Sequence, residues 1–510
     1  MSGCTRDNKR GGVLAAIERA GNRVPHTLTL FLWLLAIIFV LTFLMSVFNV
    51  TAVDPATGET VGVVNLVSTD GLLFLLTKFV ANFGAFPILG VTLVVGMGMG
   101  LCDVSGFFSS AVRFCLSNVR SEFIAFLVAF FGVFMCSFDG AVSMIIVPTL
   151  AATIYYSMGK NPLIGIFSGF SAASTGAAME FIPGFWQVVL TPLTNSYAQI
   201  ADPGFSMPLM SEYFPVLTGS ILAVLVNAFV TIKIVEPHFK EFQAVEGEGG
   251  QSDQLTPRER SAVKAAGLGI LLFLLCVFAL CLPSNSFLRG PEGSLVINAP
   301  LMSALENLLF LLFFIPGYIY ARKMGMAGTI RELAELLARG LESLLSFLVL
   351  AVVISQFISI FDYSNLGKII AIKGGMALTS LSVPPLAAIL ILFFMYAGVN
   401  LLIMSGSTKY LIFGSIVIPL MMQMNIHPAF TQMVLRLSDG SSNALSPMNP
   451  FFPTMLALCV RYDKRCGIGT ALSALLPYGA ANLVVFVAVI VVWYVFHLPL
   501  GFSGATVWLH

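Results

Sequence analysis

The ionisable residues that lie deep in apolar sequence are few, and they occur where hydrophobic runs are interrupted. In the stretch SDGSSNALSPMNPFF, Asp439 stands among hydroxyl and amide side chains, three residues after Arg436. Glu180 directly follows a similar small and polar stretch, and Asp139 and Lys409 fall in two further polar interruptions. An intramembrane charge costs several kcal/mol unless it is paired or hydrated. These residues therefore indicate a functional site.

Two kinds of chemistry suit these residues. A fixed guanidinium at Arg436 can bind a carboxylate through two N–H groups. On a helix Arg436 and Asp439 share a face, so we expect them to pair, either as part of a substrate site or as a purely structural ion pair. Glu180 has no basic neighbour within a helical turn, and a lone membrane carboxylate is a natural proton carrier. Asp139 could instead cap the following helix, and Lys409 could reach the outer surface.

The composition places these residues in a membrane protein. Of 510 residues, 57% are hydrophobic and 10% are charged, against roughly 25% charged in soluble domains. Apolar runs of about 20 residues recur along the chain, which is the length that crosses a bilayer. The five His residues are scattered, and neither HExxH, GxSxG nor CxxC occurs. We therefore expect an all-α polytopic membrane protein that is not an enzyme, with no metal, no cofactor and no nucleic acid partner.

The apolar runs predict about nine transmembrane helices and two longer hairpin stretches. A polar lead at 1–26 precedes the first membrane half, 27–236, and a charged linker at 237–262 precedes the second half, 263–510. The stretches 121–158 and 379–424 are interrupted by polar residues, and each is either a re-entrant hairpin or two crossings. The segment 328–342 is predicted to be an amphipathic helix at the membrane surface or a solvated connector. Full crossings are expected near 27–49, 72–101, 161–199, 212–236, 263–283, 302–322, 341–363, 427–458 and 470–497.

The basic residues predict the orientation. With a cytoplasmic N-terminus, most of the 26 Lys and Arg residues fall on the cytoplasmic side, as positive-inside sorting requires. We expect an inner-membrane location. The assignment does not depend on the hairpins, because two crossings in place of a hairpin leave the sidedness unchanged.

The two halves contain related segments. Aligning Pro162 with Pro428, an offset of 266 residues, places the small and hydroxyl cluster 174–176 on 440–442. Each half then consists of a hairpin with a polar tip, a short helix after proline, a polar break and a second short helix. The orientation makes the two units inverted, which is the architecture of secondary transporters. Such breaks survive in a membrane only where they are buried in protein or line a cavity, so a transporter is favoured over a channel or a membrane enzyme.

Several motifs of the second half resemble one family. GVNLLIMSGSTKY, IHPAFTQMVLRLSDGSSNALSPMNPFFP and RYDKRCGIGTALSALLPY are similar to segments of the aminobenzoyl-glutamate transporter family, as are IERAGNRVPH and the stretch from SDGLLFLLTKF to LCDVSG. The resemblance implies nine spans plus two re-entrant hairpins, a homodimer, and proton- or sodium-coupled movement of p-aminobenzoyl-glutamate or a related aromatic acid. It also implies that some members export antifolate sulfonamides.

The resemblance also implies where the site lies. In the first repeat the sequence departs from the family pattern: Glu180 stands where an asparagine is usual, and Gln187 where an aspartate is usual; Tyr410 takes the place of the aromatic residue at the hairpin tip. Glu180 is then a candidate to replace the missing aspartate as the proton carrier. The alternative function is a dicarboxylate or amino-acid carrier of the wider ion-transporter superfamily. The expected coupling-ion residues are Glu180, Asp439 and Asp139, and the expected substrate-binding residues are Asn400, Ser405, Ser407, Pro428, Arg436, Ser441 and Pro447.

Overall fold

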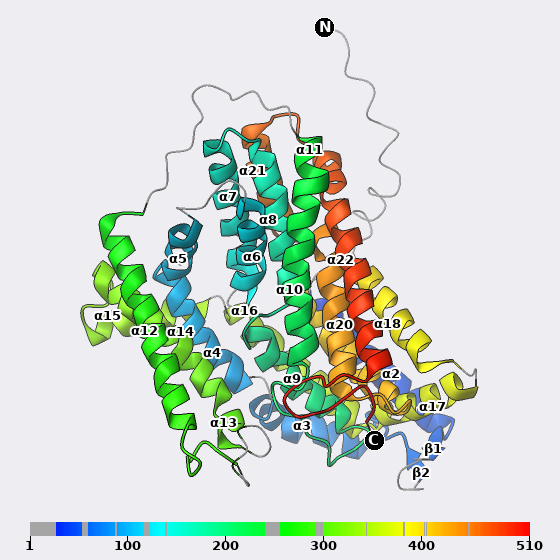
Figure 1. Ribbon diagram of the computed structural model, residues 1–510. Helices are drawn as coiled ribbons and strands as arrows, with labels where there is room; N and C mark the ends of the chain where they lie inside the picture. The colour runs from blue at the N-terminus through cyan, green and yellow to red at the C-terminus, as the bar shows by residue number, and fades with distance from the viewer. Residues whose placement is uncertain are drawn as a thin grey trace.

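The structure is a bundle of helices with one two-stranded hairpin (Figure 1). The computed structural model describes residues 27–53, 60–86, 89–116, 123–137, 140–239, 255–290, 293, 295, 299–342, 344–380, 383–401, 403, 405–446 and 449–509. The elements of the first half are α2 (Thr27–Val47), β1 (Thr51–Val53), β2 (Thr60–Gly62), α3 (Thr69–Gly84), α4 (Leu89–Val104), α5 (Phe107–Leu116), α6 (Ile124–Cys136), α7 (Gly140–Ser157), α8 (Pro162–Gly176), α9 (Phe185–Ala198), α10 (Tyr213–Val230), the π-helix η2 (Thr231–Val235) and α11 (Glu236–His238). Those of the second half are α12 (Pro257–Cys281), α13 (Pro300–Ser303), α14 (Leu305–Met324), α15 (Ile330–Glu342), α16 (Leu345–Tyr363), α17 (Leu366–Ser380), α18 (Pro385–Asn400), α19 (Gly406–Met422), α20 (Pro428–Ser442), the 3-10 helix η4 (Asn443–Leu445), α21 (Phe452–Tyr462) and α22 (Ile468–Phe496).

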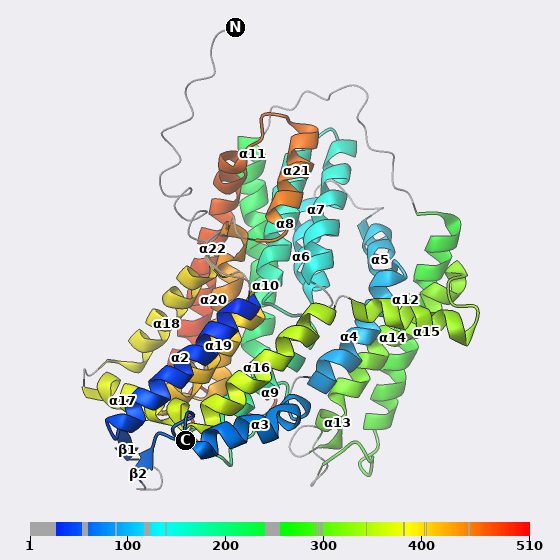
Figure 2. The ribbon, with the colours of Figure 1, turned by 180° about the vertical axis from the view of Figure 1, so that it is seen from behind.

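The helices form a central group with a smaller group on either side. The centre contains α6, α7, α8, α10, α20 and α22. On one side α12 and α14 pack with α4, α5 and α15, and on the other α2 and α3 pack on α16 (Figure 2). Most of α12 is exposed, whereas every residue of α8 and α20 is buried. The innermost helices are thus the two that carry the predicted polar breaks.

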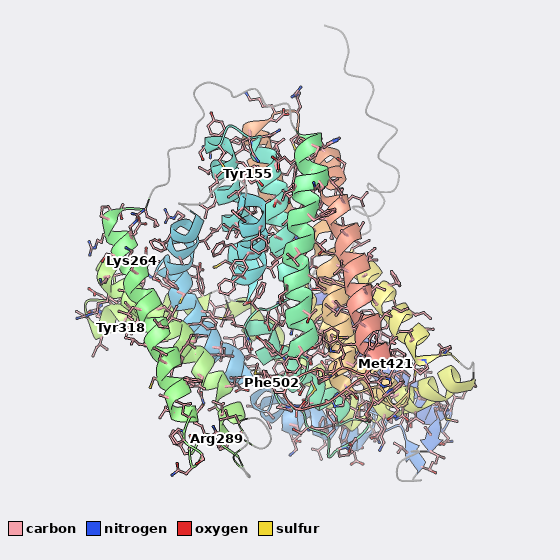
Figure 3. All side chains as sticks on the ribbon, viewed as in Figure 1. Tyr155, Lys264, Arg289, Tyr318, Met421 and Phe502 are labelled. Carbon is pink, nitrogen blue, oxygen red and sulfur yellow. The ribbon has the colours of Figure 1, made fainter. Side chains whose placement is uncertain are left out.

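The outer helix α12 has charged residues in its first two turns and is apolar from there to its end. A capping box formed by Thr256 and Glu259 begins the helix, with Pro257 in the first turn. Lys264 lies toward one end of α12, and Arg289, in the segment that follows the helix, lies beyond the other end (Figure 3). In the described part of the chain, four helices are long and apolar enough to cross a membrane, and six spans result if each of two bent helix pairs counts as one.

Several expected spans are divided in the structure. The predicted crossing 72–101 is wrong as a single helix: α3 packs on α16 and α4 on α14, and the sequence has Pro87 between them, a residue that disfavours helix in its predecessor. The crossing 341–363 ends in a bend of 64° between α16 and α17. The segments 161–199 and 427–458 each contain two shorter helices, α8 and α9 or α20 and α21. The segment 328–342 contains the helix α15, which packs on α4.

The helix boundaries follow the offset of 266 residues. Helix α7 begins at Gly140 and α19 at Gly406, and both α8 and α20 are 15 residues long and begin with the aligned prolines. The residues before these helices also correspond, because Gly159 and Asn425 both have positive φ angles, 70° and 59°. Such a conformation favours glycine and asparagine. These helix boundaries agree with the predicted offset, and the repeat and its inversion across a membrane stay predictions.

Candidate functional site

Helices α8 and α20 enter the centre from opposite ends of the molecule. Asn161, which caps α8, donates its side-chain amide to the carbonyl of Phe239 beside α11. The backbone N–H of His427, which caps α20, donates to the carbonyl of Val507 near the C-terminus. Figure 1 places α11 and the C-terminus at opposite ends of the bundle.

The C-terminal ends of the two helices meet in the interior. The Asn443 side chain, just after α20, donates to the carbonyl of Ser174 in α8 at 3.1 Å. Helix ends carry carbonyl groups without intrahelical partners, and here a side chain of the other half supplies one of the donors. The two polar breaks predicted from the sequence are therefore neighbours.

Arg436 in α20 is held by groups from the first half of the chain. Its Nε donates to the carbonyl of Ala178 at 3.1 Å, and one terminal nitrogen donates to Gln187 Oε1 at 2.6 Å and Glu212 Oε1 at 2.7 Å. The other terminal nitrogen lies 3.3 Å from Glu180 Oε2. The guanidinium is buried, with 3% of the residue exposed. Arg436 thus connects the second half to the break after α8 and to the start of α10.

The two carboxylates beside Arg436 have different surroundings. Glu180 Oε1 accepts the backbone N–H of Trp186 at 2.9 Å, so this side chain also caps the N-terminus of α9. Glu212 Oε1 accepts a second hydrogen bond, from Gln432 Nε2 at 2.7 Å. Neither Glu180 Oε2 nor Glu212 Oε2 has a hydrogen-bond partner in the described part of the chain, but Glu180 Oε2 lies 3.3 Å from a terminal nitrogen of Arg436. Both residues are buried.

A second ion pair lies nearby, between Lys409 of α19 and Asp439 of α20. The Lys409 ammonium contacts Asp439 Oδ1 and Asn400 Oδ1 and lies 5.2 Å from the centre of the Tyr396 ring. The Asn400 amide nitrogen also donates to the Asp439 carbonyl at 3.1 Å and to Asn443 Oδ1 at 2.8 Å. The Lys409 side chain is fully buried, so it does not reach the surface.

The expected pairing of Arg436 with Asp439 is wrong. Arg436 pairs with Glu180 and Glu212, and Asp439 pairs with Lys409. The spacing of Arg436 and Asp439 along one helix permits an ion pair between them. In the structure, charged residues from other elements lie closer and form the ion pairs instead. Glu180 therefore has a basic neighbour after all, supplied by the opposite half, and the reason for choosing it as the lone proton carrier no longer holds.

A small pocket lies where the two halves meet. Its cavity volume is about 20 Å³, room for about one water molecule, so the pocket is nearly closed in this structure. Its charged lining residues are Arg436 and Asp439, and its other lining residues are Ala178, Trp186, Leu190, Tyr396, Gly406, Tyr410 and Leu435. Aromatic faces together with a guanidinium can bind a planar ring that carries a carboxylate.

Four of the other predicted residues are described and do not line the pocket. Ser405 caps α19 by accepting the N–H of Thr408, and Ser407 lies 3.4 Å from its hydroxyl. Ser441 donates to a carbonyl of its own helix, and Pro428 is the first residue of α20. Asp139 and Pro447 lie outside the described residues.

Sequence reasoning missed Trp186 and Glu212. Glu212 is the first residue of a predicted span, where a charge normally marks the membrane boundary, so nothing in its sequence context distinguishes it. Trp186 adjoins Gln187 in FWQVVL, and only the break in the helix shows that its ring faces the pocket. Gln432 was missed as well; its Oε1 accepts from Thr194 and Tyr410. Over the described residues, no group of three or more His, Cys, Asp or Glu side chains is placed to bind a metal ion.

Comparisons with known proteins place this geometry in context. The model of the AbgT putative transporter family matches residues 12–508. The p-aminobenzoyl-glutamate transport protein of Escherichia coli (strain K12) is 28% identical over 501 residues, 98% of each chain. The structure of the Alcanivorax borkumensis YdaH transporter, described as having an unusual topology, matches 94% of this chain and 100% of its own, with 30% identity and a TM-score of 0.87. Neisseria gonorrhoeae MtrF, described as illuminating a class of antimetabolite efflux pumps, matches 94% of this chain and 97% of its own, with 28% identity and a TM-score of 0.87.

Proposed function

Because this chain belongs to the AbgT putative transporter family, we propose that it is a proton-coupled secondary transporter of p-aminobenzoyl-glutamate or a closely related aromatic carboxylate. The observation that carries the proposal is the pocket between the broken helices, where Arg436 lies with the aromatic rings of Trp186, Tyr396 and Tyr410. The curated relative from Escherichia coli, named for p-aminobenzoyl-glutamate transport, supports the same substrate class.

The pocket chemistry suits an aromatic acid better than a small dicarboxylate. Three of the nine lining residues are aromatic, and a single guanidinium faces the space. Succinate would leave the rings without a flat partner, whereas the benzoyl ring of p-aminobenzoyl-glutamate can stack on them while one of its two glutamate carboxylates pairs with Arg436. The family's secondary-transport architecture, with inverted repeats around a central site, gives alternating access to either side of the membrane.

The Lys409–Asp439 pair borders this pocket without giving it net charge. Asp439 lines the pocket and is neutralised by Lys409 from the neighbouring helix. We assign this pair to holding α19 and α20 together through Asn400, which contacts both residues. The chain is proposed to act as a homodimer in the inner membrane, and light scattering of the purified protein in detergent tests the oligomeric state.

Counterflow in proteoliposomes tests the proposal. Vesicles loaded with unlabelled p-aminobenzoyl-glutamate, succinate or arginine receive labelled p-aminobenzoyl-glutamate outside. We expect transient accumulation of label only when the aromatic acid is inside, and none in vesicles without protein. The experiment is repeated with labelled succinate or arginine outside. Accumulation of one of these labels, with no accumulation of labelled p-aminobenzoyl-glutamate, would instead indicate the dicarboxylate or amino-acid carrier.

A second cargo, an antifolate sulfonamide, is favoured by the structural relative described among antimetabolite efflux pumps. A sulfonamide has the aromatic ring but no carboxylate. Its transport should therefore depend on Trp186 and Tyr396 and be insensitive to Arg436→Lys, whereas transport of p-aminobenzoyl-glutamate should be impaired by that change. Measuring both cargoes in the same variant vesicles separates the two activities.

A further inference from the structure

We infer that Glu212 is the residue that carries the coupling proton, and that it does so by competing with the substrate carboxylate for Arg436. The inference rests on the proposed function and deepens it. It replaces the expectation from the sequence that Glu180 has this role. The observations that carry it are the charge balance of the Arg436 cluster and the different partners of its two carboxylates.

The cluster contains one more carboxylate than it can neutralise. Arg436 is within ion-pair distance of both Glu180 and Glu212, at 3.3 and 2.7 Å, and Lys409 is already engaged by Asp439. All three side chains of the cluster are buried, with at most 2% of each exposed. A buried unpaired charge is unfavourable. Binding one proton neutralises the cluster.

The hydrogen bonds indicate which carboxylate receives that proton. Glu180 uses one oxygen to cap α9 through the Trp186 N–H, and its other oxygen lies against Arg436. Glu180 Oε2, like Glu212 Oε2, makes no hydrogen bond in the described part of the chain, but a proton on it would lie against the Arg436 terminal nitrogen 3.3 Å away. Glu212 Oε2 has no hydrogen-bond partner in the described part of the chain, so it is free to bear a proton without displacing a donor.

The groups that face Glu212 come from three other elements. Arg436 and Gln432 approach from α20, and both donate to Glu212 Oε1. Glu180, in the segment after α8, and Tyr410 of α19 interact with it electrostatically. Arg436 is the cation of this set, so protonation of Glu212 acts mainly on the Glu212–Arg436 pair.

The proposed step is a simple exchange. A proton binds Glu212 Oε2 and forms the neutral carboxylic acid, which weakens the ion pair to Arg436. Arg436 lines the pocket, and the terminal nitrogen that Glu212 releases can then donate to a substrate carboxylate. The proton offsets the charge of the one substrate carboxylate that pairs with Arg436; the second carboxylate of p-aminobenzoyl-glutamate takes no part in this exchange. Release of the substrate allows Glu212 to lose its proton and pair with Arg436 again.

Proton uptake by the purified transporter tests the inference. Protein in weakly buffered detergent at mildly alkaline pH, with a pH-sensitive dye, is mixed with p-aminobenzoyl-glutamate. Wild-type protein should take up about one proton per molecule bound, because binding and protonation are linked. Glu212→Gln should bind without proton uptake and show affinity that no longer varies with pH. In proteoliposomes the same variant should retain counterflow and lose accumulation driven by a pH gradient.

Two matched variants and one substrate-free measurement complete the design. Glu180→Gln, whose amide oxygen can still accept the Trp186 N–H, should still take up a proton on binding. Glu236→Gln, in a separate ion pair with Lys160, should behave as wild type. Infrared titration of ligand-free protein should show a carboxylic-acid band that Glu212→Gln lacks and Glu180→Gln retains. If Glu212→Gln fails to fold, Glu212→Asp serves in its place. It keeps a titrating carboxylate and should retain proton uptake on binding.

The outcomes separate the two claims. If wild-type protein fails to bind the aromatic acid, the substrate assignment fails, and the infrared band alone decides whether Glu212 titrates. If the aromatic acid binds and Glu212→Gln still takes up a proton, or if Glu180→Gln is the variant that loses the infrared band, the assignment to Glu212 is overturned while the proposed function stands.

Discussion

Replacing Arg436 by lysine keeps the charge and removes the planar guanidinium. Arg436 faces four acceptors: the carbonyl of Ala178, Gln187 Oε1, Glu212 Oε1 and Glu180 Oε2. A lysine ammonium has three N–H groups on one atom, so it can neither satisfy all four acceptors nor form a two-bond contact with a carboxylate. A hydrogen bond that involves a charged group contributes about 1.5–3 kcal/mol.

Loss of one such bond to the substrate predicts a clear loss of affinity. Since 1.4 kcal/mol corresponds to a factor of ten, the Kd for p-aminobenzoyl-glutamate should rise by about 10- to 100-fold in Arg436→Lys. The assay is equilibrium binding of the labelled compound to purified protein in detergent. Arg465→Lys, a matched change at a side chain that is 91% exposed, should leave Kd unchanged. An Arg436→Lys protein that elutes as wild type in size exclusion and binds with wild-type affinity would refute the role of the guanidinium.

Three further predictions concern the surroundings of the pocket. Lys409→Met should lower the free energy of unfolding by about 3–5 kcal/mol, because it leaves the Asp439 charge unpaired in the interior. In thermal unfolding, the double variant Lys409→Met/Asp439→Asn should recover most of this loss, and a double variant no more stable than the single one would contradict the pairing. Gly406→Ala should weaken substrate binding, because the Cβ of the new alanine would lie 2.9 Å from Trp186 Cη2. Gly398→Ala, whose Cβ would have no heavy atom within 4 Å, should leave binding unchanged, and equal affinity of the two variants would argue against crowding of Trp186. Single cysteines at Gly140 and Ser405, in a background without native cysteines, should react with small water-soluble thiol reagents and be shielded from lipid. Modification only from the side of the membrane opposite to their flanking loops would favour two full crossings over a hairpin.

The sequence was sufficient to predict the membrane class and the polar breaks. Hydropathy and charge are local properties, and α8 and α20 begin at the two prolines whose alignment revealed the offset of 266 residues. The same local reasoning failed for 72–101. The sequence stays apolar across that stretch, so hydropathy alone predicts one helix. In the sequence a proline stands between the two helices, which pack on different partners.

The partners of the buried charges could not be predicted from the sequence. Arg436 and Asp439 are three residues apart, yet each pairs with a residue from another element. Glu212 lies 224 positions from Arg436, and its sequence context is that of an ordinary boundary charge. Only the meeting of the two halves in the centre brings the two residues together. Long-range pairing of this kind depends on the tertiary fold, which no local pattern encodes.

We propose that the pocket between the two broken helices binds an aromatic carboxylate. An experimental structure of the protein saturated with p-aminobenzoyl-glutamate, determined by cryo-electron microscopy in lipid nanodiscs, tests it most directly. We expect ligand density with the ring against Trp186 and Tyr396 and a carboxylate at Arg436. Ligand density elsewhere, with Arg436 still held by Glu180 and Glu212 and the pocket empty, would contradict it.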